Sequence, residues 1–298
     1  PAKARQAALN AVADGAQIIL GPLHAESANA VAIAMAPKNV NVLAFSNNPT
    51  IAGGNLFVLG HTFDNTANRM MSYARKQGKS RVLVVSSDNL AGEVGQGAIA
   101  RAAAANGISL AGRVRYGFSQ DGVVAAVPKI TQTARQANAD MLFLTSNTAG
   151  ALPLFAQMLP EAGLSPEVIQ YVGLTRWDQP AQTLGLPGIQ GGWFAVPDTG
   201  RMASFNNRFQ GAYGSSPHAI AGLAYDGIAA IGALARSGRG DALSRGSLTQ
   251  SSGFQGTGGT FRLLPNGTNQ RALAVATVQN GRMVIVDPAP RGFGGAGF

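Results

Sequence analysis

Small polar residues follow several apolar stretches of this sequence, at positions where they could bind a ligand. Each apolar stretch has the length and composition of a buried strand, and the polar run starts where that strand is expected to end. These runs include residues 46–50, 87–89, 145–148 and 175–178. In sheets built of strand-helix-strand units, ligands bind at the carboxyl ends of the strands, where helix N-termini offer free N–H groups to an anion. The pattern therefore indicates binding of a small polar ligand.

The same residue types also have a purely structural use. Ser, Thr, Asn and Asp are the preferred N-caps of helices, so any one of them is either a cap or a ligand contact. The number of strand ends involved favours binding over capping. The candidate ligand contacts in these runs are Ser46, Asn47, Thr50, Asp88, Ser146 and Thr148.

Trp177 and Asp178 form the most specific pair in the sequence. An acid beside a large aromatic ring at a strand end would hold an ammonium group by charge and by the ring face. The alternative is that Asp178 caps a short helix over residues 180–184 while Trp177 packs in the core. Both interpretations stay open on the sequence alone.

Enzyme and metal signatures are missing from the sequence. It contains no cysteine, no P-loop, no G-x-S-x-G and no H-E-x-x-H, and its histidines, His24, His61 and His218, are far apart along the chain. The glycines of Gly92-Glu-Val-Gly95-Gln-Gly97 have the reverse of the dinucleotide-binding spacing and indicate close helix packing instead. We therefore expect no enzymatic activity, no cofactor and no metal.

The composition predicts a folded protein of two domains. The chain has 298 residues, of which 46% are hydrophobic and 12% charged, so a large core is expected. No apolar run is as long as the about 18 residues that a membrane-spanning helix needs. The formal net charge is +9, but the basic residues are scattered, and Arg75 and Lys76 lie at an expected helix end, where cations complement the helix dipole. A nucleic-acid partner is therefore not expected.

Hydrophobic periodicity predicts a doubly wound α/β architecture. Short apolar runs that read as parallel strands alternate with Ala-rich amphipathic helices. The expected strands are residues 17–20, 41–45, 56–59, 81–86, 108–116, 140–144 and 168–173. The expected helices are residues 2–14, 24–36, 64–77, 92–106, 122–137 and 149–163. The chain opens on a helix, whereas a doubly wound domain normally starts with a strand.

The last third of the chain changes pattern after residues 192–196. Two consecutive helices are expected at 202–213 and 217–237, followed by strands at 261–264, 273–279 and 283–287. Asn280-Gly281 is a two-residue hairpin signal. Asp226 lies inside an apolar helix and is expected to be a satisfied structural carboxylate. The tail from Pro288 to Phe298 has the composition of an unpacked end.

Five segments together resemble a known family. They are Gly21-Pro22-Leu23, Val42–Asn47, Gly192–Asp198, Leu223–Ile228 and Val286–Pro290. In order and spacing they resemble type I periplasmic binding proteins of the leucine/isoleucine/valine-binding type. More narrowly, they are similar to the lipoprotein branch of penicillin-binding protein activators. The similarity extends over essentially the whole chain.

The resemblance implies two Rossmann-like lobes joined by a hinge of three crossovers, with a small ligand clasped between them. Lobe one would be residues 1–61 plus 197–266, without the N-terminal strands that relatives have, and lobe two 62–196 plus 267–298. His61 falls at an expected crossover and either lines a cleft or is an ordinary loop histidine. In amino-acid-binding relatives the ligand carboxylate meets the loop at 46–50, and an acid near 175–178 meets the ammonium.

The function that the resemblance implies is a non-catalytic receptor in the periplasm or bacterial cell envelope. Such a receptor binds a small polar or amino-acid-like solute and passes it to a membrane permease of the ABC-transporter type. Amino-acid-binding relatives carry a tyrosine before the glycine that matches Gly92, where this chain has Ala91. That difference fits the alternative, an envelope lipoprotein that activates a penicillin-binding protein, which is a peptidoglycan synthase, by protein-protein contact.

Overall fold

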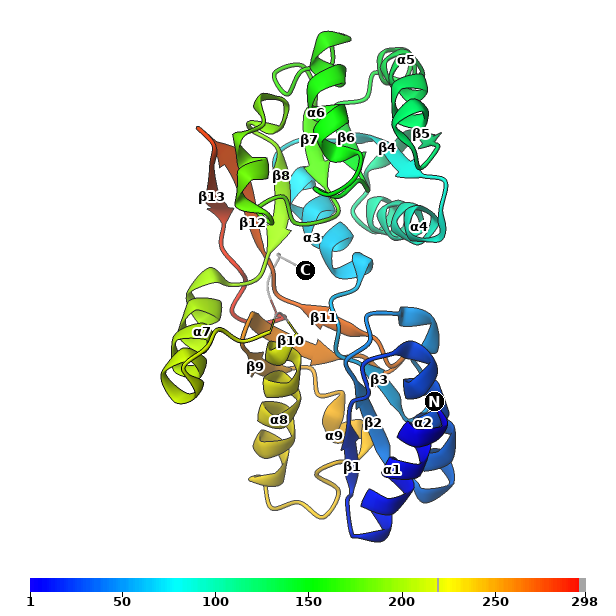
Figure 1. The fold of residues 1–298 in the computed structure, drawn as a ribbon, viewed down its shortest axis with the longest axis vertical. Coiled ribbons are helices and arrows are strands. Elements are labelled where there is room, and N and C mark those ends of the chain that lie inside the picture. The colour runs from blue at the N-terminus through cyan, green and yellow to red at the C-terminus, as the bar shows by residue number, and fades with distance from the viewer. Residues whose placement is uncertain (219, 295–298) are drawn as a thin grey trace. The chain divides into compact units, whose positions relative to one another are not determined.

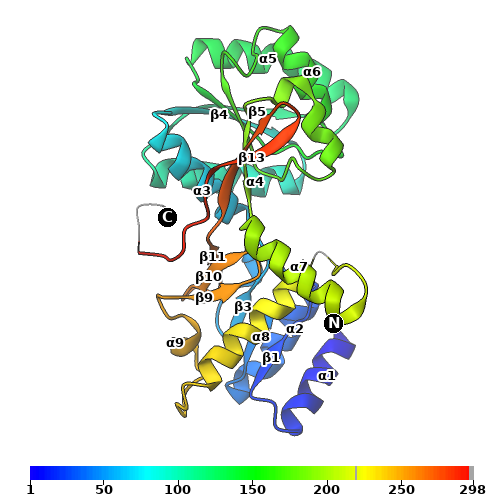
Figure 2. The same ribbon diagram turned by 90° about the vertical axis from the view of Figure 1, so that its left-hand side faces the viewer.

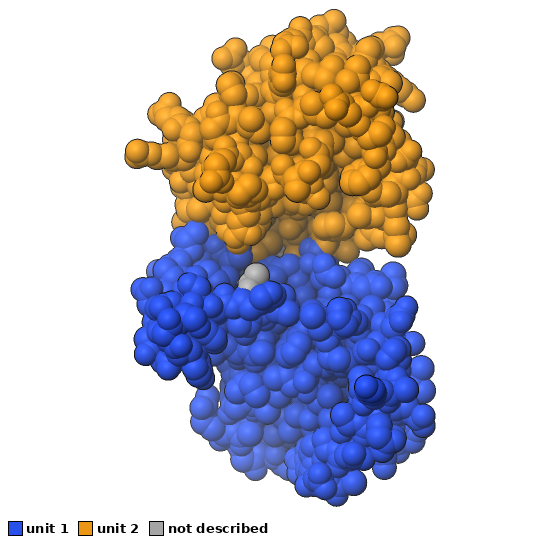
Figure 3. Space-filling view, in the orientation of Figure 1, with its two compact units in different colours: residues 1–62, 197–272, 290–295 blue, residues 63–196, 273–289, 296–298 orange. Residues whose placement is uncertain are grey.

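The computed structural model describes residues 1–218 and 220–294, which divide into two compact units (Figure 3). Unit 1 comprises Pro1–Thr62, Pro197–Ala272 and the stretch that starts at Pro290, and unit 2 comprises Phe63–Val196 and Leu273–Ala289. Figure 1 labels their helices and strands. Both units combine helices with sheets, which confirms the predicted α/β class.

The sheet of unit 2 has seven strands in the order β13-β12-β8-β7-β6-β4-β5. Strands β4 to β8 pair in parallel, whereas β12 is antiparallel to both β8 and β13. The expected hairpin is present, with Asn280 and Gly281 in left-handed conformations at its turn. The strands are β4 (Arg81–Ser87), β5 (Ser109–Tyr116), β6 (Met141–Leu144), β7 (Gln170–Gly173), β8 (Trp193–Val196), β12 (Ala274–Gln279) and β13 (Arg282–Asp287).

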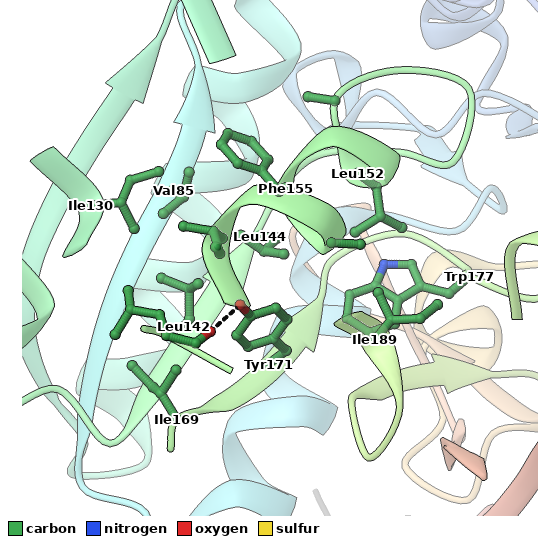
Figure 4. Close-up of a cluster of buried hydrophobic side chains, with 14 of the residues drawn as sticks. Val85, Ile130, Leu142, Leu144, Leu152, Phe155, Ile169, Tyr171, Trp177 and Ile189 are labelled. Atoms are coloured by element: carbon green, nitrogen blue, oxygen red, sulfur yellow. Dashed lines mark hydrogen bonds between the residues drawn. The ribbon is translucent and has the colours of Figure 1, made fainter. Parts of the chain in front are cut away.

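Helices cover both faces of this sheet, as the alternation of β4 residues shows. Val82 and Val84 pack with α3 (Phe63–Lys76) and α4 (Leu90–Ala105). Leu83 and Val85 point the other way, because successive strand residues face opposite sides, and pack with α5 (Gln120–Gln136) and α6 (Leu152–Glu161). Figure 4 shows part of this second cluster around Phe155 and Tyr171.

The glycines of residues 92–97 allow α4 to approach the sheet closely. A Cβ atom at Gly92 would overlap the backbone carbonyl of Ser87, and one at Gly95 would lie 2.7 Å from the Leu174 side chain. Neither position tolerates a side chain without movement of the helix. The interpretation of this motif as close packing is therefore confirmed.

Unit 1 contains two three-stranded sheets. Strands β1 (Ile18–Leu20), β2 (Asn41–Ala44) and β3 (Leu56–Val58) are parallel. Strands β9 (Phe254–Gly256), β10 (Gly259–Leu263) and β11 (Asn269–Arg271) are antiparallel. Asn269 connects the two sheets, because its Nδ2 donates to the carbonyls of Val58, at 2.8 Å, and Gly60, at 2.9 Å.

Helices flank the parallel sheet of unit 1 on both faces (Figure 2). Val42 and Ala44 pack with α1 (Ala2–Ala13) and α2 (Ala25–Met35), whereas Leu43 and Phe57 pack with α8 (Ala221–Ala235). The remaining helices are α7 (Thr199–Tyr213) and α9 (Arg245–Leu248), with 3-10 turns η1 (Ala36–Lys38), η2 (Pro49–Ile51), η3 (Ala181–Gly185) and η4 (Pro187–Ile189). Among the described residues, no helix is both long and apolar enough to cross a membrane.

Several expected boundaries were wrong. The second helix of the last third begins at Ala221 rather than at Pro217. Residues 267–272, expected in the second lobe, belong to unit 1, because β11 pairs with β10. The chain also crosses back into unit 1 at Pro290, so the described residues contain four crossovers between the units rather than the three expected.

The expectation of an unpacked tail is also corrected over the residues that the structure describes. The carbonyl of Arg291 accepts a hydrogen bond from Thr260 Oγ1 at 3.0 Å, and the Phe293 ring lies 4.5 Å from the Arg262 guanidinium. The segment up to Gly294 thus contacts β10. The expectation for residues 295–298 lies outside the described residues.

Candidate functional site

Unit 1 contains a cavity of about 550 Å³ at the carboxyl ends of its parallel strands. Three of the residues predicted from the sequence, Ser46, Asn47 and His61, line it together. The other lining residues come from the loop after β2, the start of α2, the end of β3, α7, α8 and the β9–β10 turn. They are Leu23, His24, Ala25, Phe45, Asn48, Gly60, Met202, Ile220, Gly222, Leu223, Asp226, Thr257 and Gly258.

Ser46 is fixed in place by its neighbours. Its side chain is buried, its Oγ accepts the Asn48 N–H at 3.1 Å, and its carbonyl accepts the Gly60 N–H at 3.0 Å. A Cβ atom at Gly60 would lie 2.6 Å from that carbonyl oxygen, so the close approach of the two loops requires glycine. The hydroxyl of Ser46 therefore has a defined position at the cavity wall.

Thr50 does not line the cavity. Its N–H and Oγ1 both donate to Asn48 Oδ1, at 3.0 and 2.8 Å, at the start of η2. Asn48 is thus the cap of this turn, and Thr50 supports the cap. For Thr50 the structure favours the capping interpretation over a ligand contact.

The start of α2 adds polar backbone groups to the cavity. Leu23, His24 and Ala25 line it, and His24 is the N-cap residue, although its side chain caps nothing. The first N–H groups of a helix have no partner within the helix and carry its positive dipole end. The sequence signal for this part of the site was the run Gly21-Pro22-Leu23-His24 after a predicted strand, but His24 was not among the predicted contacts.

Asp226, which lines the cavity, forms a buried ion pair with Arg271. Asp226 Oδ2 lies 2.9 Å from Arg271 Nη1, and Asp226 Oδ1 accepts the Thr257 N–H at 2.7 Å and Thr257 Oγ1 at 3.1 Å. Asp226 is only 1% exposed. Its charge is compensated within the protein, which confirms the prediction of a satisfied structural carboxylate.

The remaining predicted residues belong to unit 2. Asp88 accepts the Phe118 N–H at 3.1 Å, and Thr148 donates to the Gln179 carbonyl at 2.6 Å. These two hydrogen bonds connect loops within unit 2. Ser146 differs, because its Oγ is buried without a hydrogen-bond partner among the described residues, as is Thr145 Oγ1.

The Trp177–Asp178 pair is not arranged to hold an ammonium group. Trp177 is fully buried in the core of unit 2, with its ring centroid 5.8 Å from that of Phe194. Asp178 forms a two-point ion pair with Arg176, with Nε 2.9 Å from Oδ1. The capping interpretation of Asp178 is wrong as well, because η3 follows Pro180 without a side-chain cap.

Metal binding finds no support in the described part of the chain. His24 and His61 both line the unit 1 cavity, although they are far apart in sequence. Within residues 1–218 and 220–294, however, no group of three or more His, Cys, Asp or Glu side chains is suited to hold a metal ion.

Two α/β units, between which one chain crosses several times, and a cavity with polar and apolar lining residues at strand ends define the class of α/β ligand-binding proteins. The model of the periplasmic binding protein family matches residues 1–282. The chain therefore belongs to the periplasmic binding proteins, as the resemblance predicted. No curated protein matches the chain, and the narrower activator branch stays a prediction.

Solved structures share this fold at low sequence identity. One is described as a putative branched-chain amino acid ABC transporter from Rhodospirillum rubrum, with a TM-score of 0.78, 17% identity and coverage of 95% of this chain and 84% of that chain. An ABC transporter substrate-binding protein from Desulfitobacterium hafniense, in complex with Leu, has a TM-score of 0.67, 18% identity and coverage of 96% and 84%. A solute-binding protein from R. palustris, in complex with benzoate, has a TM-score of 0.62, 17% identity and coverage of 98% and 83%.

Proposed function

We propose that the protein is a non-catalytic, extracytoplasmic receptor for a small carboxylate with an apolar body, bound in the unit 1 cavity. The observation that carries this proposal is the cavity itself, in which Ser46, Asn47 and His61 meet at the strand ends. The family supports an extracytoplasmic location. An ABC-type permease is the partner that such a receptor would serve.

The wall of the cavity has a polar and an apolar part. Ser46, Asn47 and the first N–H groups of α2 offer hydrogen-bond donors to an anion. Phe45, Met202 and Leu223 offer apolar surface. Among the described lining residues there is no Lys or Arg, so hydrogen bonds and the helix dipole would hold the carboxylate, rather than an ion pair.

The named ligands of two structural relatives support this ligand class. Leucine and benzoate are the ligands of the D. hafniense and R. palustris proteins. Both compounds combine a carboxylate with an apolar body, and only leucine carries an ammonium group. Arg176 already neutralises Asp178, the acid predicted to meet that ammonium. We therefore expect that an ammonium group is not required and that benzoate binds at least as tightly as leucine.

Titration calorimetry with leucine, benzoate and the uncharged analogue benzamide tests the proposal. We expect saturable binding of benzoate and about tenfold or greater weakening for benzamide, because hydrogen bonds to a charged group contribute about 1.5 to 3 kcal/mol. Ser46→Ala should weaken benzoate binding by a similar factor. Ser204→Ala is the matched control, since Ser204 is exposed on α7 and does not line the cavity.

Two outcomes would contradict the proposal. Equal binding of benzoate and benzamide would mean that no anion site exists at the strand ends. Failure of every small carboxylate to bind, together with saturable binding to a peptidoglycan synthase, would favour the alternative of activation by protein-protein contact.

A further inference from the structure

Thr257 lies in the β9–β10 turn at the wall of the unit 1 cavity, which Gly222 and Asp226 of α8 also line. Thr257 is only 5% exposed. Its Oγ1 lies 3.1 Å from Asp226 Oδ1, and a Cβ atom at Gly222 would lie 2.7 Å from the same Oγ1. Three residues of the cavity wall thus meet at one hydroxyl group, and the lack of a side chain at Gly222 leaves room beside it.

The proton of this hydroxyl group is committed to Asp226. Arg271 pairs with Asp226, with 2.9 Å between Nη1 and Oδ2, and an ionised carboxylate only accepts hydrogen bonds. Thr257 Oγ1 must therefore donate to Asp226 Oδ1. Over residues 1–218 and 220–294, Thr257 Oγ1 makes no other hydrogen bond. Its lone pairs therefore remain available to accept a hydrogen bond from a ligand.

The charges around Thr257 favour a neutral donor on the ligand. Asp226 and Arg271 compensate each other, and Asp226 is the one acidic residue among the described residues that line the cavity. An ammonium group would leave water without gaining an unpaired carboxylate, which is unfavourable. A hydroxyl group loses less hydration and can donate one hydrogen bond to Thr257 Oγ1. The donor that fits best is therefore a hydroxyl group.

The position of the Thr257 hydroxyl group is fixed by the protein itself. The Thr257 N–H also donates to Asp226 Oδ1, at 2.7 Å, so backbone and side chain are held by one carboxylate oxygen. A Cβ atom at Gly256 would lie 2.7 Å from that oxygen, so the close approach of the turn to α8 requires glycine. A group that is ordered in this way loses little freedom when a ligand binds, which favours selectivity.

We propose that Thr257 is a specificity-determining contact and that the ligand of the unit 1 cavity carries a hydroxyl group on its apolar body, in addition to its carboxylate. The carboxylate binds at Ser46 and Asn47, and the hydroxyl group donates to Thr257 Oγ1. Asp226 acts through Thr257 as a positioning residue and does not itself bind the ligand. This inference rests on the proposed function, because it concerns the other end of the same ligand.

Titration calorimetry on the intact protein tests the proposal with benzoate, meta-hydroxybenzoate, para-hydroxybenzoate and the two matching methoxybenzoates. A methoxy group has the oxygen of the hydroxyl group but no proton to donate. We expect one of the two hydroxybenzoates to bind about twofold to tenfold more tightly than benzoate, which is the range for one neutral hydrogen bond. The methoxybenzoate with the same substitution pattern should not show this gain.

Variants at position 257 locate the contact. Thr257→Val has nearly the same shape but no oxygen, so it should abolish the gain of the hydroxybenzoate and leave the affinity for benzoate nearly unchanged. Thr257→Ser keeps the hydroxyl group and should keep the gain. The matched control is Thr249→Val, since Thr249 Oγ1 donates to the Arg245 carbonyl at 2.9 Å and Thr249 does not line the cavity. Circular dichroism shows whether each variant is folded.

The results separate this inference from the proposed function. Binding of benzoate with no preference for either hydroxybenzoate would overturn the inference alone. An equal gain for the methoxybenzoate would do the same, because it would indicate an apolar contact rather than a donated hydrogen bond. A gain that Thr257→Val leaves unchanged would place the hydroxyl group elsewhere and would also overturn the inference. Failure of all five carboxylates to bind would contradict the proposed function, and this inference with it.

Discussion

Arg271 and Asp226 form a buried ion pair, with 2.9 Å between Nη1 and Oδ2, and Asp226 also lines the unit 1 cavity. The two residues are 45 positions apart and are 5% and 1% exposed. Arg271 also donates through Nε to the Leu59 carbonyl at 3.2 Å. The pair thus connects β11 with α8 and with the end of β3, two segments whose residues line the cavity.

Removing one charge of this pair should destabilise unit 1. Asp226→Asn keeps the size of the side chain but leaves the Arg271 guanidinium without its carboxylate in a buried site. Breaking a buried pair in this way costs about 3 to 5 kcal/mol. Urea unfolding followed by circular dichroism measures the loss.

An exposed ion pair provides the control for this prediction. The Arg239 and Asp241 side chains are 65% and 58% exposed, so Asp241→Asn should leave the free energy of unfolding nearly unchanged. A loss for Asp226→Asn no greater than that for Asp241→Asn would contradict the role assigned to the buried pair.

The parallel strands could be predicted from the sequence, whereas β11 could not. Each parallel strand is a short run of apolar residues between turn signals, and its pattern is local. In β11, by contrast, the buried residues are Asn269 and Arg271. Their burial depends on partners more than 40 positions away, Val58 and Gly60 for the first and Asp226 and Leu59 for the second. The composition of residues 269–271 does not indicate such long-range hydrogen bonds.

Stability should fall with rising pH in the alkaline range because of Tyr171. Its hydroxyl donates to the Leu164 carbonyl inside the unit 2 core, and burial raises the pKa of this phenol well above its ordinary value of 10.0. Above pH 10 the unfolded state loses the proton while the folded state keeps it. The contribution of Tyr171 to stability is therefore complete below pH 10 and decreases above it by at most about 1.4 kcal/mol per pH unit, while burial also raises the pKa of Tyr73 and Tyr116 and adds to the loss.

Tyr171→Phe separates two contributions of this hydroxyl to stability, namely its hydrogen bond and its titration. At pH 7 the variant should lose about 1 to 3 kcal/mol, because the buried Leu164 carbonyl is left without a donor. Above pH 10 its stability should fall less steeply than that of the parent. Tyr213→Phe, on the exposed surface of α7, should not change stability at pH 7. Parallel curves for the parent and Tyr171→Phe above pH 10 would show that Tyr171 does not cause the decrease.

Two glycine substitutions should have opposite effects. A Cβ atom at Gly188 would overlap the Ala156 carbonyl of α6, so Gly188→Ala must push η4 away from that helix. We expect a loss of about 1 to 3 kcal/mol, as for overpacking of a core. Gly232 lies inside α8 with open space at its Cβ position. Gly232→Ala should therefore stabilise by about 0.5 to 1 kcal/mol. Thermal unfolding of both variants measures the sign, and equal shifts would contradict the packing described for η4.

The candidate site could be predicted only where it depends on strand ends. Ser46 and His61 meet because neighbouring parallel strands end at one edge of the sheet. The assignment of Trp177 and Asp178 failed for a different reason. Arg176, two positions before Asp178, neutralises the carboxylate, and this neighbouring opposite charge was visible in the sequence. The contribution of Thr257 had no signal, because the β9–β10 turn reaches the cavity through tertiary contacts alone.

Substitution of Ser146 tests whether its hydroxyl serves ligand binding or the stability of the fold. Its Oγ lies buried in unit 2 with no hydrogen-bond partner among the described residues, and a buried hydroxyl without a partner is unfavourable. Ser146→Ala should therefore leave the free energy of unfolding unchanged or raise it by about 1 kcal/mol. The sequence predicts Ser146 as a ligand contact, but the proposed site is the unit 1 cavity, so the same variant should leave benzoate affinity unchanged. A loss of affinity of about tenfold would contradict the proposed site and assign the hydroxyl to the ligand.

Thr145→Val and Thr148→Ala complete the comparison. Thr145 Oγ1 also lacks a partner among the described residues, so Thr145→Val, which has nearly the same shape, should stabilise as Ser146→Ala does. Thr148→Ala loses the bond to the Gln179 carbonyl and should destabilise. Calorimetry and thermal unfolding of the three variants measure affinity and stability separately. Loss of stability in Ser146→Ala would contradict the assignment of this hydroxyl as one without a hydrogen-bond partner, because removal of an unpaired buried hydroxyl does not destabilise the fold.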